Sequence, residues 1–412
     1  MLKKFKKSIR SSRHAFIILS LLTFFFSAQV SLTIYINSSF LKDRIAHTDS
    51  FTLMKLWSDP EHVVGAVYTL ASLLTILGLL YSPRILRKIG NYRWTLSLFL
   101  LHITLLLGLA LFQSGWLIIP MFMIENMLIS LIFYNFDIFL EHYSNNEHTG
   151  VIRGLYMTIG SIAWLLPPMI AGRIVEQSGY GLVYFLGAFL IIPVIILLIK
   201  YLSDFKDMEY DNAPLFPSRA TIHKNPDIWY GLGSSFFLQF FYAWMVIYMP
   251  LLLHDHLHYD WGSIGLMMTF ALSAFVIFPS PAGWLADKLI GEKELMVLGF
   301  LIMGVTSLMI PRLAHESAPA FALWALLLFA GRSGASLVDS MNEAYFFKQI
   351  DEHNAGLLGY YRRMNPLAMI VAAMCASILL EFGLLDITSL FYLLGVLMFL
   401  AIYFPLRLKD TK

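Results

Sequence analysis

The stretch Pro281-Ala-Gly-Trp-Leu-Ala-Asp-Lys-Leu-Ile-Gly-Glu-Lys293 is a short polar segment between two long apolar ones, near 262–282 and 294–311. Each apolar run is long enough to cross a bilayer, because about 20 apolar residues in a helix span the hydrocarbon core. The pattern therefore predicts two membrane helices joined by a charged turn of about ten residues. Within the turn, we expect Gly283 to let one helix end pack closely and Asp287 to place a negative charge at a helix terminus.

The composition is that of an all-α, polytopic membrane protein. Of the 412 residues, 58% are hydrophobic and 14% are charged, and the mean hydropathy is +0.69, which lies outside the range of soluble domains. Apolar runs of about 18 residues or more predict twelve membrane spans. The first span follows a basic N-terminal segment and, ending near Ile36, is too long for a cleavable signal. The single cysteine, Cys375, excludes an intrachain disulfide.

The distribution of Lys and Arg predicts the topology. Twelve spans put both termini on one side of the membrane, and with that side in the cytoplasm most of the 29 Lys and Arg residues are cytoplasmic. We expect a multi-pass protein of the cytoplasmic membrane, with an N-terminal six-helix bundle over 1–201, a central cytoplasmic loop over 202–226 and a C-terminal six-helix bundle over 227–412. Five basic residues fall on the opposite side: Lys42, Arg44, Lys55, Arg173 and Arg312.

The two halves match weakly, as in an internal repeat. Thr33-Ile-Tyr-Ile36 in the first span matches Val246-Ile-Tyr-Met249 in the seventh. An alignment of the fourth and tenth spans puts Asp137 opposite Glu343, so polar residues recur at equivalent depths. We therefore predict two pseudo-symmetric bundles.

A chain of six plus six spans with Gly-x-x-x-Asp-Lys between spans eight and nine resembles the major facilitator superfamily over its whole length. The family's loop signature reads Gly-x-x-x-Asp-Arg/Lys-x-Gly-Arg/Lys. Gly283, Asp287, Lys288 and Gly291 fit it with one extra residue, Ile290. The resemblance implies a solute carrier that works by alternating access, with the two halves rocking about a central site.

A copy of the loop in the first half, Pro83–Arg93, departs further from the signature. Pro83 replaces the glycine and Arg87 replaces the aspartate, while Lys88 and Gly90 remain. This departure gives some weight to a second function class, a protein of transporter fold that no longer transports.

Charged residues near the cytoplasmic ends of the spans are candidates for a latch. Asp137 could pair with Arg87, Lys88 or Arg93, and Glu343 with Lys288 or Lys293. The family's pseudo-symmetry places Asp287 near Arg153. Breaking such pairs would favour one gate state over the other. The predicted gate and latch residues are Gly283, Asp287, Lys288, Gly291, Arg87, Lys88, Asp137, Glu343 and Arg153.

The tenth span carries three charged residues, Arg332, Asp339 and Glu343, with Ser336 between them. Spacings of seven and four place them on one helical face. Charges within a membrane span are costly and need a partner or a water-filled cavity. Arg332, near mid-membrane, is predicted to hold an anionic or hydrogen-bonding solute, with Ser336 and Asp339 beside it. The alternative is an internal pair between Arg332 and a carboxylate that only stabilises the bundle.

Glu125 and Asn126 lie near the middle of the fourth span. Burial disfavours the charged form of a carboxyl group, so Glu125 is a candidate for coupling transport to a proton. Asn126 is a candidate substrate contact. The alternative is a protonated or Asn-bonded glutamate in a helix contact.

Gln29 in the first span, and Gln239 and Tyr242 in the seventh, are polar groups in otherwise apolar helices. They are predicted to line the substrate cavity. Hydrogen bonding between helices is an equally good explanation of each.

No catalytic or cofactor motif stands out. The loop His254-Asp-His-Leu-His-Tyr-Asp260 lacks an established metal geometry, and we take it as a solvated loop. No phosphate loop, Gly-x-Ser-x-Gly or His-Glu-x-x-His motif is present. We therefore expect neither an enzyme nor a cofactor. The expected partners are a small organic solute, the lipid bilayer and protons as a candidate coupling ion, with no nucleic acid and a monomeric chain.

Overall fold

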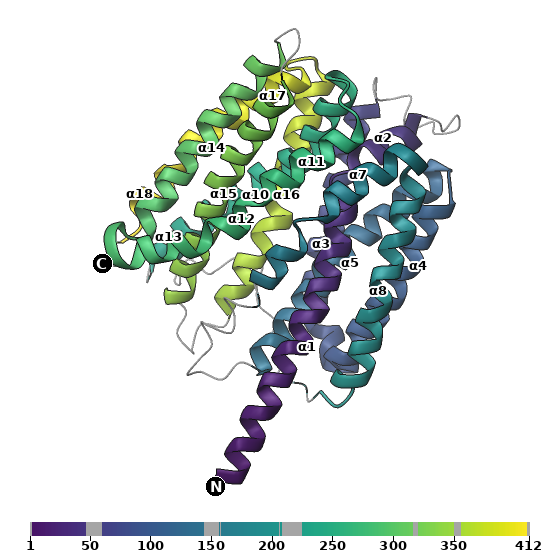
Figure 1. The fold of residues 1–412 in the computed structure, drawn as a ribbon, viewed down its shortest axis with the longest axis vertical. Coiled ribbons are helices and arrows are strands. Elements are labelled where there is room, and N and C mark those ends of the chain that lie inside the picture. The colour runs from purple at the N-terminus through teal and green to yellow at the C-terminus, as the bar shows by residue number, and fades with distance from the viewer. Residues whose placement is uncertain are drawn as a thin grey trace.

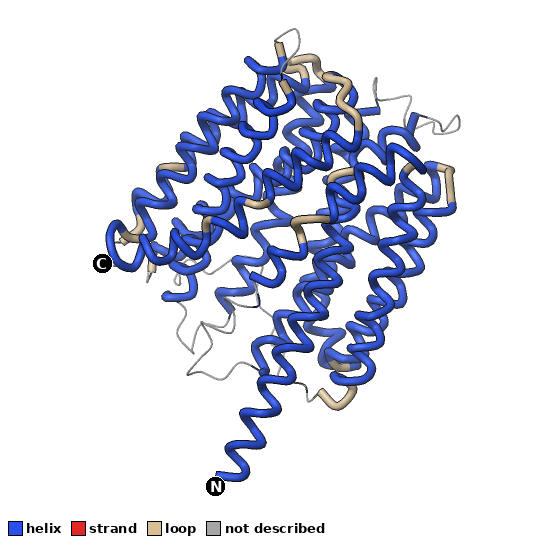
Figure 2. The backbone as a smooth tube through the Cα atoms, viewed as in Figure 1, coloured by secondary structure: helices blue, strands red, loops and turns tan. Residues whose placement is uncertain are grey.

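The structure, a computed structural model, describes residues 2–46, 60–143, 156, 158–205, 207, 225–315, 320–349 and 356–409. These residues are almost entirely helical, and no strand occurs among them (Figure 2). Twelve of the described helical segments are long and apolar enough to cross a membrane, as the sequence predicts. The predicted Arg153 lies outside the described residues.

The N-terminal half contains seven labelled helices. They are α1 (Leu2–Ile34), α2 (Asn37–Ala46), α3 (Pro60–Ile89), α4 (Asn91–Leu111), α5 (Gly115–Tyr143), α7 (Pro167–Ser178) and α8 (Tyr180–Leu202). Helix α2 is short and follows the first span, and α7 is the second part of the fifth span, Thr158–Ser178. The six spans of this half pack on one another, with α4 and α1 against α8 and α3 against α5.

The C-terminal half contains the remaining helices. They are α10 (Pro226–Leu251), η2 (Leu252–His256), α11 (Trp261–Leu272), α12 (Ala274–Ile277), α13 (Pro279–Leu285), η3 (Ala286–Ile290), α14 (Glu292–Ala314), α15 (Phe321–Gln349), α16 (Gly356–Glu381), α17 (Ile387–Ala401) and α18 (Tyr403–Arg407). Helix α14 packs against α15 and α17, and α10 against α16.

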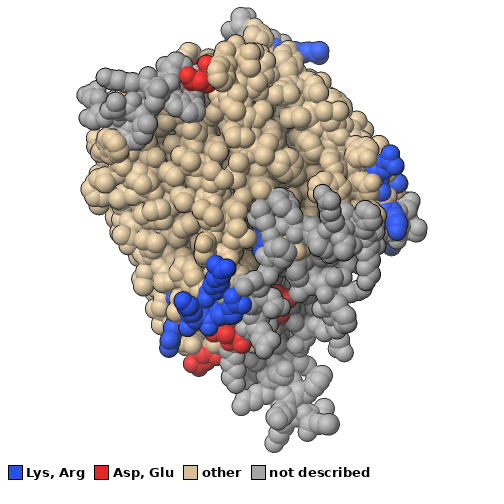
Figure 3. All heavy atoms as spheres, turned by 180° about the vertical axis from the view of Figure 1, so that it is seen from behind, with Lys and Arg blue, Asp and Glu red and all other residues tan. Residues whose placement is uncertain are grey.

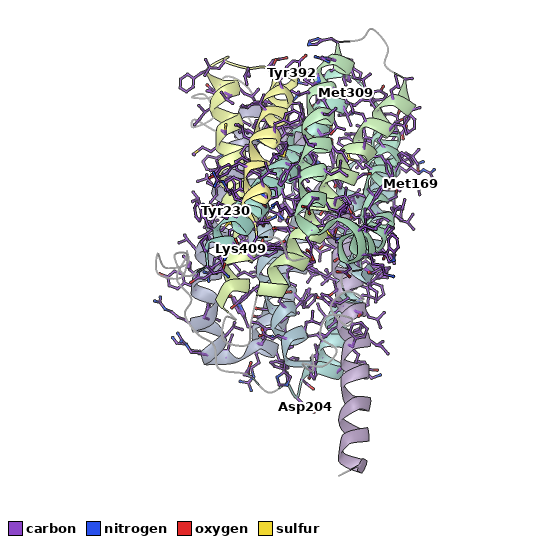
Figure 4. All side chains as sticks on the ribbon, turned by 90° about the vertical axis from the view of Figure 1, so that its left-hand side faces the viewer. Met169, Asp204, Tyr230, Met309, Tyr392 and Lys409 are labelled. Carbon is purple, nitrogen blue, oxygen red and sulfur yellow. The ribbon has the colours of Figure 1, made fainter. Side chains whose placement is uncertain are left out.

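The two halves stand side by side (Figure 1). The N-terminal half, purple to teal, forms the right of the view, and the C-terminal half, green to yellow, forms the left. The N-terminus lies at the lower tip of its half and the C-terminus at the lower left end of the other. We call this the terminal end of the molecule and the opposite one the far end. In Figure 4, Lys409 lies toward the terminal end of the C-terminal half, and Met309 and Tyr392 lie toward its far end.

The predicted ten-residue turns are wrong in length. Helix α3 continues through Pro83 to Ile89, and the eighth span continues through Gly283 and Asp287 to Ile290. A single glycine then reverses the chain in each half. Gly90 has φ 80° and ψ 159°, and Gly291 has φ 88° and ψ 162°. Only glycine adopts this region without strain, so the two turns share one geometry.

The extra residue Ile290 is absorbed by a change of helix type. The backbone N–H of Gly291 donates to the carbonyl of Ala286, five residues back, in the π-turn η3. In the first half the N–H of Gly90 donates to Leu86, four residues back. A π-turn accommodates one added residue without moving the helix end, so Gly291 still closes its span.

Two of the spans at the interface between the halves are interrupted beside their prolines. The fifth span loses regular helix at 164–166, immediately before Pro167 and Pro168, and the eighth at Phe278, immediately before Pro279. The eighth span has a second break at Ser273, which has no proline beside it. Proline lacks the N–H that a helix needs and clashes with the preceding turn. The fifth span is therefore broken and is not one continuous helix.

Candidate functional site

A cavity of about 410 Å³ lies between the two halves. The N-terminal half contributes residues from α1, from Tyr35 just beyond it, from α5 and from the start of the fifth span. The C-terminal half contributes residues from α10, α11, α12, α15 and α16. Its volume lies within the usual range for sites of small molecules. Its polar lining residues are Thr23, Ser27, Tyr35, Asp137, Tyr156, Ser161, Gln239, Tyr242, Arg332, Asp339, Glu343 and Asn365.

The halves touch each other at the far end. Helix α3 packs against α16, and α7 against α11. Gly172 on α7 lies against the carbonyl of Trp261, and Gly265 on α11 against the carbonyl of Pro168, so the helix backbones meet directly. At the same end, Lys42 Nζ lies 2.9 Å from a carboxylate oxygen of Asp255 in the other half. These contacts close the far end of the cavity.

Arg332 lies on α15 and lines the cavity with a side chain that is only 5% exposed. Its Nη2 donates to the hydroxyl of Tyr35 in the N-terminal half at 3.3 Å. Its guanidinium carbon lies 6.0 Å from the ring of Tyr35, 5.9 Å from Phe241 and 5.6 Å from Tyr242. Within the described chain no carboxylate forms an ion pair with Arg332, so the predicted alternative of an internal pair has no support here. A guanidinium has five N–H donors, and four remain for a ligand or water.

Two amides form a second polar feature of the wall. The side-chain N–H of Asn365 on α16 donates to Gln239 on α10 at 2.6 Å. Both residues line the cavity, as does Tyr242 one turn further along α10. The amide pair can offer its remaining donor and acceptor to a solute.

The predicted acidic residues of the tenth span also reach the cavity. Asp339 and Glu343 line it together with Arg332, as expected from their spacing along one helical face. Asp137 lines it from α5 in the other half. The repeat alignment that paired Asp137 with Glu343 thus brings together two residues of the same cavity.

Aromatic side chains complete the wall. Phe133, Trp164, Phe275 and the ring of Tyr156 line the cavity. The hydroxyl of Thr23 donates to Tyr156 at 2.5 Å. Flat aromatic faces beside hydrogen-bonding groups are suited to a solute with a ring.

Glu125 does not line this cavity. It lies inside the N-terminal half, 1% exposed, and neither of its carboxylate oxygens has a hydrogen-bond partner among the described residues. Tyr68 on α3 and Tyr184 on α8 lie within electrostatic reach of it. The hydroxyl of Tyr184 donates to Asn37 at 2.7 Å. The carboxyl group is therefore enclosed by the bundle and separate from Arg332.

Three further predicted substrate contacts lie away from the cavity. Gln29 is fully buried and bonds to the ring of His102 at 2.9 Å, so hydrogen bonding between helices describes it better than contact with a solute. Ser336 is buried on α15 and Asn126 is half-buried on α5, and neither lines the cavity.

The predicted latch residues occupy the terminal end. Gly283 lies within α13, and a Cβ atom there would meet nothing within 4 Å, so the prediction of close packing at Gly283 is wrong. Arg87 and Lys88 are exposed at the end of α3. Lys288 Nζ lies 5.7 Å from the ring of Trp284. Their role as a latch stays a prediction.

Sequence reasoning missed Tyr35, Asn365 and the aromatic wall. Tyr35 lies in the Thr33–Ile36 segment that matches the seventh span, so the repeat carried a signal for it. Phe133 and Phe275 look like any other lipid-facing or packing residue, and only the packed structure distinguishes them. His254 bonds to the carbonyl of Tyr259 and packs against Trp261.

Comparisons with known proteins address the fold and family. Residues 232–412, most of the C-terminal half, match the sequence model of the Major Facilitator Superfamily. The crystal structure of the nucleoside transporter NupG, in a mutant form, matches with a TM-score of 0.69 at 12% identity, covering 96% of this chain and 100% of that one. No curated protein matches the sequence.

Proposed function

We propose that this chain, whose residues 232–412 match the model of the Major Facilitator Superfamily, is a secondary active transporter that carries a small organic solute across the cytoplasmic membrane by alternating access. Arg332 carries the proposal. A buried charge without a partner is costly, and a side chain that keeps its donors open toward a cavity can use them on a ligand. Its bond to Tyr35 also links the two halves across the site.

The wall of the cavity favours a ring-bearing solute with hydrogen-bond acceptors. Arg332 would donate to an acceptor, the Gln239–Asn365 pair would bond to a hydroxyl or amide, and Trp164 or Phe275 would pack against a ring. Nucleosides have all three features, and a nucleoside transporter shares the fold. We therefore infer that nucleosides are the first class of solute to test.

Alternating access would exchange one closed end for the other. In this structure the far end is closed by α3 with α16 and by α7 with α11. Loss of these contacts, with closure of the terminal end, would expose the same cavity to the other side of the membrane. The Lys and Arg distribution favours a cytoplasmic terminal end.

Glu125 supports coupling to protons. A carboxyl group held in an apolar bundle with no counter-charge binds a proton readily and can release it when water reaches it. Because Glu125 lies outside the cavity, the proton and the solute would bind at different sites and be coupled through movement of the halves.

Reconstituted protein tests the function. Purified protein would first be screened by thermal shift against nucleosides, sugars, amino acids and carboxylates, because a ligand that binds only the folded state raises its apparent stability. A ligand found this way should exchange across proteoliposomes, and Arg332→Ala should abolish the exchange. A protein that binds the ligand but exchanges none of it would instead be a sensor of transporter fold, the alternative function.

A further inference from the structure

Four exposed basic side chains at the terminal end each lie over an exposed aromatic ring, whereas a fifth pair there, Arg363 over Tyr360, is buried. The cation-to-ring distances are 5.2 Å for Arg84 over Tyr81, 5.2 Å for Lys200 over Tyr201, 5.7 Å for Lys288 over Trp284 and 5.3 Å for Arg407 over Tyr403. Each pair lies at the terminal end of an even-numbered span: α3, α8, the α13–η3 segment and α18. We call the four pairs the basic–aromatic rim.

The rings of the rim are about half exposed. Tyr81 is 53% exposed, Tyr201 47%, Trp284 55% and Tyr403 51%. By contrast, the ring of Phe40 beneath Arg44 is fully buried. A buried pair serves packing inside the protein, whereas the rim pairs turn both the cation and the ring outward.

The rim repeats between the two halves. The internal repeat relates the second span to the eighth and the sixth to the twelfth, and the four pairs lie at the ends of these spans. Tyr81–Arg84 thus corresponds to Trp284–Lys288, and Lys200–Tyr201 to Tyr403–Arg407. The residue types and spacings differ between counterparts, while the chemistry is the same. A basic side chain over an exposed ring thus recurs in both members of two sets of related span ends.

Exposed apolar side chains adjoin the rim, and Asp and Glu side chains lie beside the basic cluster at the lower left of Figure 3. Next to the rim lie exposed lipid-facing side chains such as Ile89, Ile199 and Leu289. On the face seen in Figure 3, most Lys and Arg side chains lie along the lower left and right edges, and a broad uncharged area separates them from those at the top. Tyr and Trp prefer the boundary between hydrocarbon and headgroups, so the cations above them lie at headgroup depth.

We propose that the basic–aromatic rim binds the headgroup phosphates of anionic phospholipids in the leaflet at the terminal end. The Lys or Arg would contact the phosphate, and the ring beneath would pack against the glycerol and the first carbons of the acyl chains. A free anion would use the cation and gain nothing from the exposed ring. The pairing of both groups therefore favours a lipid over a soluble phosphate.

Lipid retention in nanodiscs tests the proposal. The full-length protein would be placed in discs with equal amounts of phosphatidylglycerol and phosphatidylcholine, and the lipids that stay bound on release would be counted by native mass spectrometry. The wild-type protein should retain more phosphatidylglycerol than phosphatidylcholine. Each Lys or Arg changed to Gln should weaken phosphatidylglycerol binding at its own site about fivefold. The quadruple variant R84Q/K200Q/K288Q/R407Q should show no excess.

Matched controls separate the rim from general charge. Arg173 and Arg312 are exposed at the far end, and the double variant R173Q/R312Q should retain the wild-type excess. Tyr81→Leu with Tyr403→Leu should reduce the excess while keeping all four cations. Equal retention by wild type and the quadruple variant would overturn the proposal. So would the same loss in R173Q/R312Q, or displacement of the lipid by inorganic phosphate. Unfolding in pure phosphatidylcholine discs should be unchanged in every variant, which checks that each one folds.

Discussion

The two halves of this membrane protein place their intramembrane charges in opposite ways. In the C-terminal half, Arg332 lines the cavity and donates one hydrogen bond to Tyr35 of the other half. In the N-terminal half, Glu125 is sealed inside the bundle without a hydrogen-bond partner among the described residues. The two charges lie at similar depth in equivalent spans. The depth of a charged residue in the membrane therefore determines how costly its charge is. The direction of its side chain determines whether it faces the cavity or the interior of the bundle.

Arg332→Ala should break the C-terminal side of this comparison. Loss of charge-assisted hydrogen bonds costs about 1.5–3 kcal/mol, so the Kd for a solute found in the thermal screen should rise roughly 10- to 100-fold. The Kd of Arg332→Lys should lie between those of the wild type and Arg332→Ala, because an ammonium group keeps the positive charge but lacks the planar set of N–H donors of a guanidinium. Binding and counterflow measure the effect, with Arg312→Ala as a control at the far end. If Arg332 only held Tyr35 in place, Arg332→Ala would lose stability and keep its affinity.

Glu125→Gln tests the N-terminal side. A pH difference of one unit is worth about 1.4 kcal/mol, or about tenfold accumulation of a solute carried with one proton. The amide is close in shape to a protonated carboxyl group, so solute exchange should continue while this accumulation falls to the level without a gradient. Uptake with and without the pH gradient measures the two separately. Unchanged accumulation in the variant would remove Glu125 from the coupling.

The last spans of the two halves start with different caps. Asp386 accepts a bond from the N–H of Ser389 at the start of α17, whereas α8 begins after Gly179, with no side-chain cap. Asp386→Ala should therefore cost about 1 kcal/mol of unfolding free energy at neutral pH. Gly179 has φ 77° and ψ −179°, which strains any other residue, so it offers no neutral comparison. Val396→Ala, at an exposed position inside α17, removes no capping bond and is the comparison for thermal unfolding in detergent.

The contribution of Asp386 should depend on pH. Partial burial raises the pKa of Asp386, but hydrogen bonds from Ser389 and the nearby His315 outweigh it and leave the pKa below the ordinary 3.8. A lowered carboxyl pKa stabilises the folded state above the ordinary value, and this stabilisation is lost as the pH falls through the lowered one. Wild type and Asp386→Ala should thus converge in stability under strongly acidic conditions and differ at pH 7.

The smallest effect is expected where the halves touch at the far end. The Lys42–Asp255 pair is partly exposed, so Lys42→Ala should shift the balance toward an open far end by about 0.2–1 kcal/mol. Spin labels at Arg173 and Arg312 would report the opening as a longer distance by double electron–electron resonance. The exchanged pair Lys42→Asp with Asp255→Lys should restore the wild-type distance. If the double variant gave the same spin-label distance as Lys42→Ala, the ion pair would not hold the two halves together.

The fold was largely predictable from the sequence, and the site only in part. Long apolar runs reveal membrane spans, and helical spacing correctly placed Arg332, Asp339 and Glu343 on one face of α15. Turn lengths were not predictable, because charged residues can continue a helix beyond the hydrocarbon, as they do up to Gly90 and Gly291.

The sequence failed mainly to predict whether a single polar side chain in a span points into its own bundle or into the cavity. Gln29 and Gln239 look alike in the sequence, yet one bonds to His102 inside a bundle and the other to Asn365 in the cavity. The partner lies far away along the chain in both cases, so local pattern carries no information about it. Only the packing of one helix against another separates the two.

The contact of α7 with α11 through Gly172 and Gly265 has a mechanical consequence. Where two helices meet backbone to backbone, no side chains interdigitate between them. Separating the helices therefore needs no side-chain rearrangement, and neither does bringing them together again. The α7–α11 contact can therefore be closely packed and still separate quickly. A methyl group added at either glycine would overlap a backbone carbonyl of the facing helix and force the two helices apart.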